Sequence, residues 1–282
     1  MNVESEKLRI ARAICNQLNV ALESELGAGA FKNAYLVSYE QDRYALKIAP
    51  VSESLRPRFE REVQALKDCS HPSIAVLRYA KAHAVEDKSY WVIVEEYLAH
   101  GTLEDRLKNG NLPREAVLNM GIALASAIAH LHEKKLVHRD IKPANILFRT
   151  PADAVLTDFG IVRTLSEPSL THDFIMQGPG TPLYAAPEQL LNEKAAIDWR
   201  TDQFGLSLVL VKSLTGHHAF APANGGPQEA VSAVSQRADL PMHVSEQLHA
   251  LGLECLVKAL KPWPVQRYRY PKDFLDALNG AS

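Results

Sequence analysis

The sequence predicts an α+β fold in two lobes, a small antiparallel β lobe with one main helix and a larger, mostly helical lobe. Its first third carries short β-prone runs separated by turns, whereas helical spacing alternates with Pro- and Gly-containing loops from residue 187 onward. Hydrophobic residues make up 46% of the chain and charged residues 23%, which is typical of a globular protein. A chain of 282 residues can form one large domain or two lobes.

The charge balance and the cysteines narrow the class of protein. With 31 Lys and Arg against 33 Asp and Glu, the formal charge is −2, and no basic excess indicates a nucleic-acid or anionic membrane partner. Cys15, Cys69 and Cys255 lie far apart and match no metal-ligand spacing, which is typical of reduced thiols. The start of the chain lacks the apolar core of a signal peptide, and the apolar run near "FGLSLVLV" is too short to span a membrane. We therefore expect a cytoplasmic protein with no membrane span and no nucleic-acid partner.

An N-terminal helix, within residues 1–19, is expected to precede a β-rich small lobe over residues 20–98. Apolar residues such as Leu8 and Ile14 fall at the spacing of one helix face. In residues 19–50, β-prone runs are split by a Gly-containing turn and by "EQDR", which predicts three successive antiparallel strands. "LRPRFEREVQALKDC" returns to helical spacing, and further strands are expected around "IAVLRYAKAHAV" and "SYWVIVEEYL".

The larger lobe is expected over residues 99–282, with the boundary near residues 98–101. Its first long helix is predicted in "REAVLNMGIALASAIAHLHEK", and short strands follow it. Further helices are predicted in "DQFGLSLVLVKSLTG", "SEQLHALGLECLVKAL" and "YPKDFLDALNG". Two such lobes would leave a cleft between them, where ligand sites tend to form.

Two glycines mark a turn that suits phosphate binding. Gly27 and Gly29 lie between two predicted strands, where missing side chains let a backbone approach phosphates closely. Two glycines in a hairpin are more often only a turn. A dinucleotide-binding fold requires a helix after the glycines, whereas "NAYLV" is typical of a strand.

Lys47 stands in the otherwise apolar strand "YALKIA". A lysine in a strand usually extends its ammonium group to solvent. Glu62, on the next predicted helix, offers a partner that can orient Lys47 toward phosphates, although an ordinary surface glutamate is the alternative.

Three oxygen-bearing side chains follow in "HRDIKPANILF" and "TDFG". Asp140, Asn145 and Asp158 carry the hard ligands that suit Mg²⁺, and carboxylates also accept protons. Taken singly, each has a bland explanation: a turn cap, a satisfied loop backbone, or an Asx turn before Gly160. Their occurrence together with Lys47 favours phosphoryl transfer from a nucleotide.

Together these motifs resemble the catalytic domain of eukaryotic-type (Hanks-type) serine/threonine protein kinases, from about residue 20 to residue 278. The resemblance implies a bilobal protein-kinase-like fold and transfer of the γ-phosphoryl group of ATP to Ser/Thr hydroxyls of protein substrates. The "APEQ" run leans toward bacterial members.

The resemblance also implies roles for the residues of the catalytic loop. Asp140 would be the catalytic base, and Lys142 would neutralise the transferring phosphoryl group. Asn145 and Asp158 would hold Mg²⁺, with Mn²⁺ as an alternative. Thr181 would contact the catalytic aspartate and lysine.

In the small lobe, Lys47 would contact the α- and β-phosphates and pair with Glu62. The nucleotide-binding residues that the resemblance implies are Leu26, Gly27, Gly29, Ala34, Ala45, Lys47, Glu96, Leu98 and Leu147.

Three further residues match structural positions of the family. Glu188 would pair with Arg267 to support the loop that receives the substrate. Asp202 would hold the backbone of the "HRD" turn.

Departures from the family pattern concern the nucleotide site. Lys32 replaces the third glycine of the phosphate loop, and Ala34 replaces the usual valine. Glu95 stands just before the segment that would join the lobes, where the family mostly has an apolar or Thr side chain. A buried carboxylate is unfavourable unless it is paired. Either Glu95 meets a cation or the alignment is displaced by one residue.

Regulation and specificity are less defined. Autophosphorylation is expected between residues 164 and 180, where phosphate can dock on Arg139. The candidate acceptors are Thr164, Ser166, Ser169 and Thr171. Ala144 and Thr102 stand where kinases that prefer basic substrates carry acids, which argues against a strict arginine requirement.

Other functions compete with this interpretation. A nucleotide-binding scaffold of the pseudokinase type would normally lack one of the catalytic residues, and an aminoglycoside-type phosphotransferase would lack the "APE" loop and the "RDIKP" form. A purely structural domain would leave the polar motifs unexplained. A regulatory partner is expected at the N-terminal helix or the small lobe.

Overall fold

The computed structural model describes residues 5–28, 33–51, 56–158, 182–222 and 225–281. Its described residues divide into two compact units, which are treated separately. The first unit takes in the chain up to Ser70 together with Ala75–Leu98, and the second takes in His71–Ile74 and the chain from Ala99 onward.

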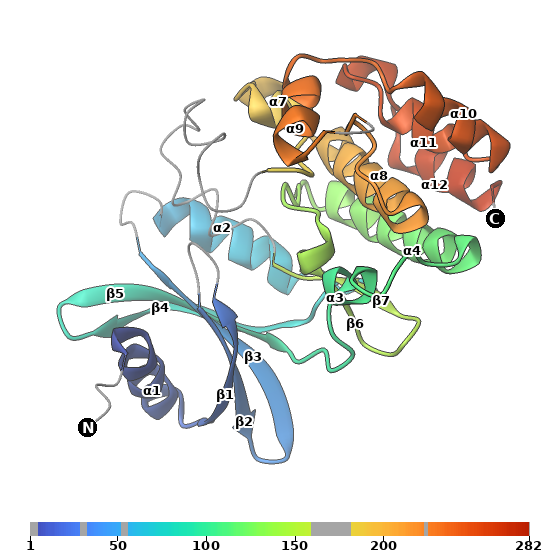
Figure 1. Ribbon diagram of the computed structural model, residues 1–282. Helices are drawn as coiled ribbons and strands as arrows, with labels where there is room; N and C mark the ends of the chain where they lie inside the picture. The colour runs from blue at the N-terminus through green and yellow to red at the C-terminus, as the bar shows by residue number, and fades with distance from the viewer. Residues whose placement is uncertain (1–4, 29–32, 52–55, 159–181, 223–224, 282) are drawn as a thin grey trace. The chain divides into compact units, whose positions relative to one another are not determined.

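The first unit is built on a five-stranded antiparallel sheet with the order β1-β2-β3-β5-β4 (Figure 1). Its strands are β1 (Ala21–Ala28), β2 (Asn33–Tyr39), β3 (Asp42–Pro50), β4 (Leu77–Val85) and β5 (Lys88–Glu96). The three successive strands predicted from "EQDR" and the glycine turn are confirmed. The predicted strand at "IAVLRYAKAHAV" begins three residues late, because Ile74 forms an isolated bridge with Leu156 instead.

Alternation along the strands gives the sheet two different faces. Tyr35, Val37, Leu46 and Ile48 are buried and form one cluster on the first face. The residues between them in sequence, among them Lys47, point to the opposite face because successive strand side chains alternate.

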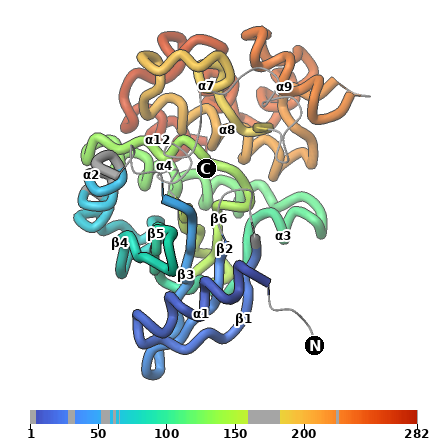
Figure 2. The backbone as a smooth tube through the Cα atoms, turned by 90° about the vertical axis from the view of Figure 1, so that its left-hand side faces the viewer, coloured from blue at the N-terminus to red at the C-terminus, as the bar shows by residue number. Residues whose placement is uncertain are grey.

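Helix α1 (Glu6–Leu18) covers the first face of the sheet (Figures 1 and 2). It begins at Ser5, whose hydroxyl accepts a hydrogen bond from the backbone N–H of Leu8, and ends at Asn19 in the left-handed conformation. Its apolar side, with Ala11, Ile14 and Cys15 buried, packs into the cluster described above. The predicted N-terminal helix is therefore part of the small unit's core.

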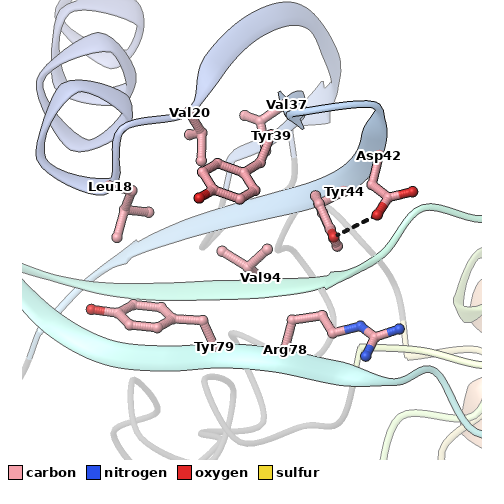
Figure 3. Close-up of a pocket in the computed structure, with 9 residues that line it drawn as sticks. All are labelled: Leu18, Val20, Val37, Tyr39, Asp42, Tyr44, Arg78, Tyr79 and Val94. Carbon is pink, nitrogen blue, oxygen red and sulfur yellow. Dashed lines mark hydrogen bonds between the residues drawn. The ribbon is translucent and has the colours of Figure 1, made fainter.

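A pocket of about 380 Å³ lies beside the end of α1 (Figure 3). Its lining residues are Leu18, Val20, Val37, Tyr39, Asp42, Tyr44, Arg78, Tyr79 and Val94. Apolar and tyrosine side chains predominate, and the hydroxyl of Tyr44 donates a hydrogen bond to Asp42.

Helix α2 (Arg56–Lys67) belongs to the same unit and packs near β4. Phe59 is buried and stacks on Trp91 of β5, with ring centroids 3.6 Å apart. This contact fixes one turn of the helix to the sheet.

The second unit is mostly helical. Its central helix α4 (Arg114–Glu133) packs against α8 (Trp199–Thr215) and α12 (Pro271–Asn279). A two-stranded sheet of β6 (Ile146–Phe148) and β7 (Ala154–Leu156) contacts α4 through β7. The other helices and 3₁₀ turns are α3 (Leu103–Leu107), η2 (Pro143–Asn145), α7 (Pro187–Leu190), η3 (Lys194–Ala196), α9 (Pro227–Ser235), α10 (Met242–Ala250), α11 (Glu254–Ala259) and η4 (Pro264–Gln266).

Helix α8 is buried on nearly all sides, from Trp199 to Ser213. This accounts for the apolar run "FGLSLVLV", which is core. Among the helices that the structure describes, none has the length and apolar character needed to cross a membrane.

Candidate active site

The loop between α4 and β6 holds three of the predicted catalytic side chains in contact with one another. Lys142 Nζ donates to Asp140 Oδ2 at 2.9 Å. Asn145 Nδ2 donates both to the same oxygen and to the backbone oxygen of Asp140, each at 2.8 Å. One oxygen of the Asp140 carboxylate thus accepts from both a cation and an amide, while Lys142 stays partly exposed.

A buried carboxylate fixes the backbone just before Asp140. Asp202 on α8 accepts hydrogen bonds from the backbone N–H groups of His138, at 2.7 Å, and Arg139, at 2.8 Å. Arg139 has a φ of 65°, an unfavourable conformation for a non-glycine residue that these bonds stabilise. Burial raises the pKa of Asp202 to about 7, and the two backbone donors oppose that rise. The role predicted for Asp202 matches these contacts.

The β6–β7 hairpin brings Asn145 and Asp158 to the same end of a small sheet. Asn145 directly precedes β6, and Asp158 follows β7 after Thr157. Because Ile146 pairs with Leu156, the backbone N–H of Thr157 can donate to the oxygen of Asn145, at 3.0 Å. His138 bonds the backbone oxygen of Thr157 through Nε2, at 3.0 Å, and so ties the hairpin to the catalytic loop.

These two residues suit a hard cation. Asn145 donates through its amide nitrogen, and its amide oxygen and the Asp158 carboxylate are both oxygen ligands of the kind that Mg²⁺ takes. The described residues hold no cluster of three or more His, Cys, Asp or Glu side chains in metal-binding geometry.

In the first unit, Lys47 is buried and paired with Glu95. The Lys47 ammonium group donates to Glu95 Oε2, and each side chain is about nine-tenths buried. The register of β3 and β5 sets Ala45 opposite Glu95 and Lys47 opposite Ile93, so the two charged residues are diagonal neighbours on one face. Glu95 therefore meets a cation, which was one of the two alternatives left by the sequence, and its pairing with Lys47 was not predicted.

The predicted partner of Lys47, Glu62, lies on α2, but its side chain is outside the described part of the structure. The same holds for four other predicted residues or segments: Gly29, Lys32, Thr181, and the candidate phosphorylation sites between residues 164 and 180.

The remaining predicted nucleotide-binding residues fall into both units. Gly27 pairs with Ala34 across β1 and β2, next to the partly exposed Leu26. Ala45 lies on β3, and Leu98 is buried just after β5. Leu147 belongs to the second unit, on β6.

Glu96 has a structural contact of its own. Its Oε1 accepts a hydrogen bond from the backbone N–H of Val76 at 2.9 Å, and its backbone N–H donates to the oxygen of Val76 at 3.0 Å. The side chain therefore holds the end of β5 against the residue before β4.

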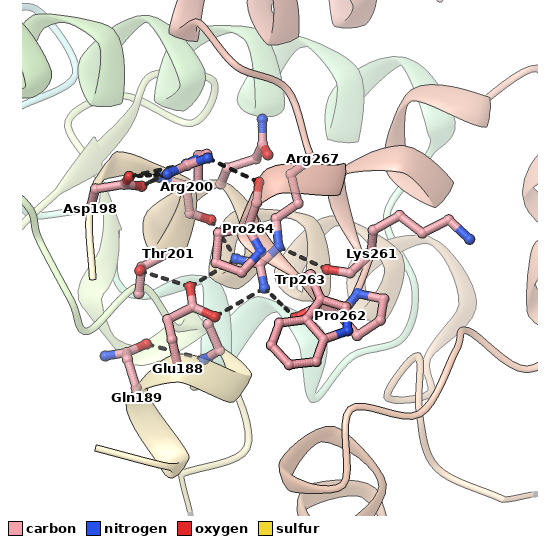
Figure 4. A network of polar contacts seen from close by, with 12 residues as sticks. Glu188, Gln189, Asp198, Arg200, Thr201, Lys261, Pro262, Trp263, Pro264 and Arg267 are labelled. Carbon is pink, nitrogen blue, oxygen red and sulfur yellow. Dashed lines mark hydrogen bonds and ion pairs between the residues drawn. The ribbon is translucent and has the colours of Figure 1, made fainter. Parts of the chain in front are cut away.

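Glu188 and Arg267 form the predicted ion pair, and it is fully buried (Figure 4). Arg267 reaches both carboxylate oxygens, at 2.8 and 3.0 Å, and Thr201 donates to Glu188 as well. The other guanidinium N–H groups donate to the backbone oxygens of Lys261, Arg200 and Pro262. Burial lowers the pKa of Arg267, and the Glu188 carboxylate opposes this shift.

Helix α7 and the segment before it are held by two further contacts, which sequence reasoning missed. Gln189 Nε2 donates to the backbone oxygen of Arg139 at 2.8 Å, and its Oε1 accepts from Ala186. His218 bonds the backbone oxygen of Leu183 at 2.7 Å. The bonds from Gln189 to Arg139 and from His218 to Leu183 join residues far apart in the chain, so no local sequence pattern predicts them.

Comparison with known proteins finds a family whose members resemble this chain in sequence. The family model described as protein kinase domain matches residues 20–269. Serine/threonine-protein kinase PknF of Mycobacterium tuberculosis is 33% identical over 272 residues, which cover 90% of this chain and 54% of that protein. Serine/threonine-protein kinase PrkC of Bacillus subtilis is 34% identical over 224 residues, covering 77% of this chain and 33% of that protein.

A probable serine/threonine-protein kinase of Clostridium perfringens is 28% identical over 272 residues, covering 95% of this chain and 36% of that protein. The chain thus spans between about a third and about half of the length of these bacterial relatives.

Proposed function

This chain belongs to the protein kinase domain family, and from that premise we propose that it is an ATP-dependent serine/threonine protein kinase. It transfers the γ-phosphoryl group of ATP to serine or threonine hydroxyls of protein substrates. The observation that carries the proposal is the Asp140 carboxylate held jointly by Lys142 and Asn145. The printed names of the relatives support the serine/threonine class.

Asp140 is the group that accepts the proton of the substrate hydroxyl. Its carboxylate is oriented by two donors and by a backbone that Asp202 fixes, so it needs little reorganisation when the hydroxyl arrives. Lys142 stabilises negative charge on the phosphoryl group during transfer, because its ammonium group sits next to the base and remains accessible to substrate.

The nucleotide is proposed to bind with its phosphates near Lys47 and the turn at Gly27. Ala45, Leu98 and Leu147 are the apolar residues proposed to contact the adenine. The remaining nucleotide-binding residues of the proposal are Leu26, Gly29, Ala34 and Glu96. Family membership implies ATP and a divalent cation.

The divalent cation is proposed to be Mg²⁺, with Mn²⁺ as a substitute, held by Asn145 and Asp158 together with phosphate oxygens. When bound, such a cation supplies positive charge that offsets the charge of the phosphates. The shared position of Asn145 and Asp158 at one end of the β6–β7 hairpin supports this assignment.

Four further points remain proposals: the domain boundaries at residues 19 and 98, a cytoplasmic location, autophosphorylation between residues 164 and 180, and a regulatory partner. We place that partner at α1 or the small unit. The pocket at the end of α1 supports a binding role for this surface.

The proposal is tested by labelled phosphate transfer. The protein is incubated with γ-labelled ATP and Mg²⁺, with itself and a serine/threonine peptide array as acceptors. Asp140→Asn keeps the size of the side chain and removes the base, so transfer is expected to fall by about 10²–10⁴-fold. Asp239→Asn, at an exposed aspartate of the same unit, is the matched control and should leave the rate unchanged.

Nucleotide binding by the wild-type protein without any transfer contradicts the proposal and favours a scaffold. Equal transfer by wild type and Asp140→Asn contradicts the assignment of the base.

A further inference from the structure

Lys47 and Glu95 are two opposite charges removed from water on one face of the small sheet. They come from adjacent strands, β3 and β5, and contact each other directly within a single compact unit. A carboxylate without a partner in this place would be strongly unfavourable, and the ammonium group of Lys47 offsets that cost by direct contact.

A phosphate ligand makes a conflicting demand on the same ammonium group. A nucleotide brings several negative charges toward Lys47, where Glu95 has already placed one. Charges separated by a few ångströms in a partly desolvated site interact strongly. Glu95 therefore opposes the nucleotide in two ways: it neutralises the cation that attracts the phosphates, and its own charge repels them.

We propose that Glu95 is a positioning residue that holds Lys47 in the nucleotide-free protein and lowers the affinity of the site for nucleotide phosphates. This inference rests on the proposed function, in which Lys47 contacts the α- and β-phosphates. To reach Lys47, the phosphates must either share its ammonium group with Glu95 or displace Glu95 from it.

Both variants of the test remove the charge of Glu95. Glu95→Gln preserves the length of the side chain and leaves an oxygen that can still accept a bond from Lys47. Glu95→Thr also removes the charge, and it introduces a residue type that the family resemblance allows at this position. If one of the two variants fails to fold, the other still gives a decisive result.

Dissociation constants are measured for Mg·ATP, Mg·ADP and adenosine by titration calorimetry. The inference predicts that Glu95→Gln binds Mg·ATP about tenfold more tightly than wild type, Mg·ADP more tightly by a smaller factor, and adenosine equally. The gain grows with phosphate charge because the effect acts on phosphates. Without nucleotide, the melting temperature of Glu95→Gln is lower than that of wild type, because the buried ammonium group of Lys47 no longer faces the charge of Glu95.

Two controls separate this role from a general effect. Asp87→Asn removes a carboxylate from the exposed turn between β4 and β5 of the same unit, and it should leave all three affinities unchanged. In a Lys47→Met background, the gain from Glu95→Gln should shrink, because the residue acts largely through Lys47.

Unchanged Mg·ATP affinity in both Glu95 variants overturns the inference and indicates a purely structural pair. Loss of affinity for adenosine together with the nucleotides overturns it as well, since Glu95 would then contact the base.

Measuring phosphate transfer with the same wild-type preparation distinguishes the proposed function from the inference about Glu95. Wild-type transfer without tighter binding by the variants leaves the proposed function standing and the inference wrong. Tighter binding by Glu95→Gln without wild-type transfer supports the inference and contradicts the proposed function. If wild type and variants neither bind Mg·ATP nor transfer phosphate, both are wrong.

Discussion

Each of the two compact units contains a buried ion pair. Lys47 pairs with Glu95 in the first unit, called the sheet unit below, and Arg267 pairs with Glu188 in the second, called the helical unit. The two pairs differ in the shape and flexibility of the cation. The five guanidinium N–H groups of Arg267 find five acceptors, two carboxylate oxygens and three backbone oxygens. The ammonium group of Lys47 sits on a flexible four-carbon stem and can turn toward another anion.

This difference shows how one kind of interaction serves two purposes. A planar guanidinium in a saturated network has a single favourable geometry, so it fixes the position of α7, which carries Glu188. A flexible ammonium group can exchange one acceptor for another when a ligand arrives. A rigid guanidinium whose five N–H groups are all bound therefore marks the structural pair, and the position of Lys47 on the proposed nucleotide face marks the functional pair.

The largest expected effect on stability comes from breaking the saturated pair. Glu188→Ala leaves the guanidinium of Arg267 buried without its counter-ion, which should lower the free energy of unfolding by about 3–5 kcal/mol in urea denaturation. The double variant Glu188→Leu with Arg267→Met should recover part of that loss, because it removes both charges. Glu254→Gln, in an exposed pair with His249, is the control and should change stability by less than about 0.5 kcal/mol. A loss equally small in Glu188→Ala would contradict the structural role.

Breaking the other pair should affect transfer more than folding. Lys47→Met is expected to lower kcat/KM for ATP by about 10²-fold or more, because a phosphate-binding cation is lost. The free energy of unfolding should fall by about 1–3 kcal/mol, since Glu95 is left without this partner. Transfer kinetics and denaturation of the same samples measure both quantities. An unchanged kcat/KM would place Lys47 with Arg267 among structural residues.

The cap of α1 tests whether the helix only covers the sheet. Ser5→Ala removes the hydroxyl that accepts from Leu8, and the expected cost is about 0.5–1 kcal/mol in the free energy of unfolding. Transfer to peptides should be unchanged, whereas Ser5→Asp should retain the stability by capping in the same way. A change in peptide transfer by Ser5→Ala would instead link α1 to catalysis.

The smallest effect is expected for an exposed ion pair that joins α1 to the turn after β4. Arg9 and Glu86 approach to 3.3 Å, and both side chains are more than half exposed. Arg9→Ala should change the free energy of unfolding by less than about 0.5 kcal/mol. A loss comparable to that of Glu188→Ala would show that burial does not separate the pairs.

Local patterns predicted much of the fold. Helix α1 and the first three strands follow from short-range periodicity, and α4 follows from a run of small and apolar residues. Asp140, Lys142 and Asn145 could be predicted as a group because six consecutive residues of the chain contain them all. Each of these patterns lies within a short stretch of sequence, so it can be recognised without knowledge of the fold.

The missed features depend on register and on distant contacts. Lys47 and Glu95 are 48 residues apart in the chain. They become diagonal neighbours only because of the register in which β3 pairs with β5. The bond from Gln189 to the backbone of Arg139 likewise joins residues that are 50 positions apart. The one available signal was an acid at position 95, where the family mostly has an apolar or Thr side chain, and it left open whether Glu95 meets a cation or the alignment is displaced by one residue.

The central claim of the proposed function is that Lys47 and Asp158 are both needed for nucleotide binding. Titration calorimetry with Mg·ATP tests it directly on the wild-type chain, Lys47→Met, Asp158→Asn and the control Asp239→Asn. The account predicts one binding event per chain, weakened by both substitutions and unaffected by the control. Mg·ATP affinity that survives unchanged in either Lys47→Met or Asp158→Asn would contradict it.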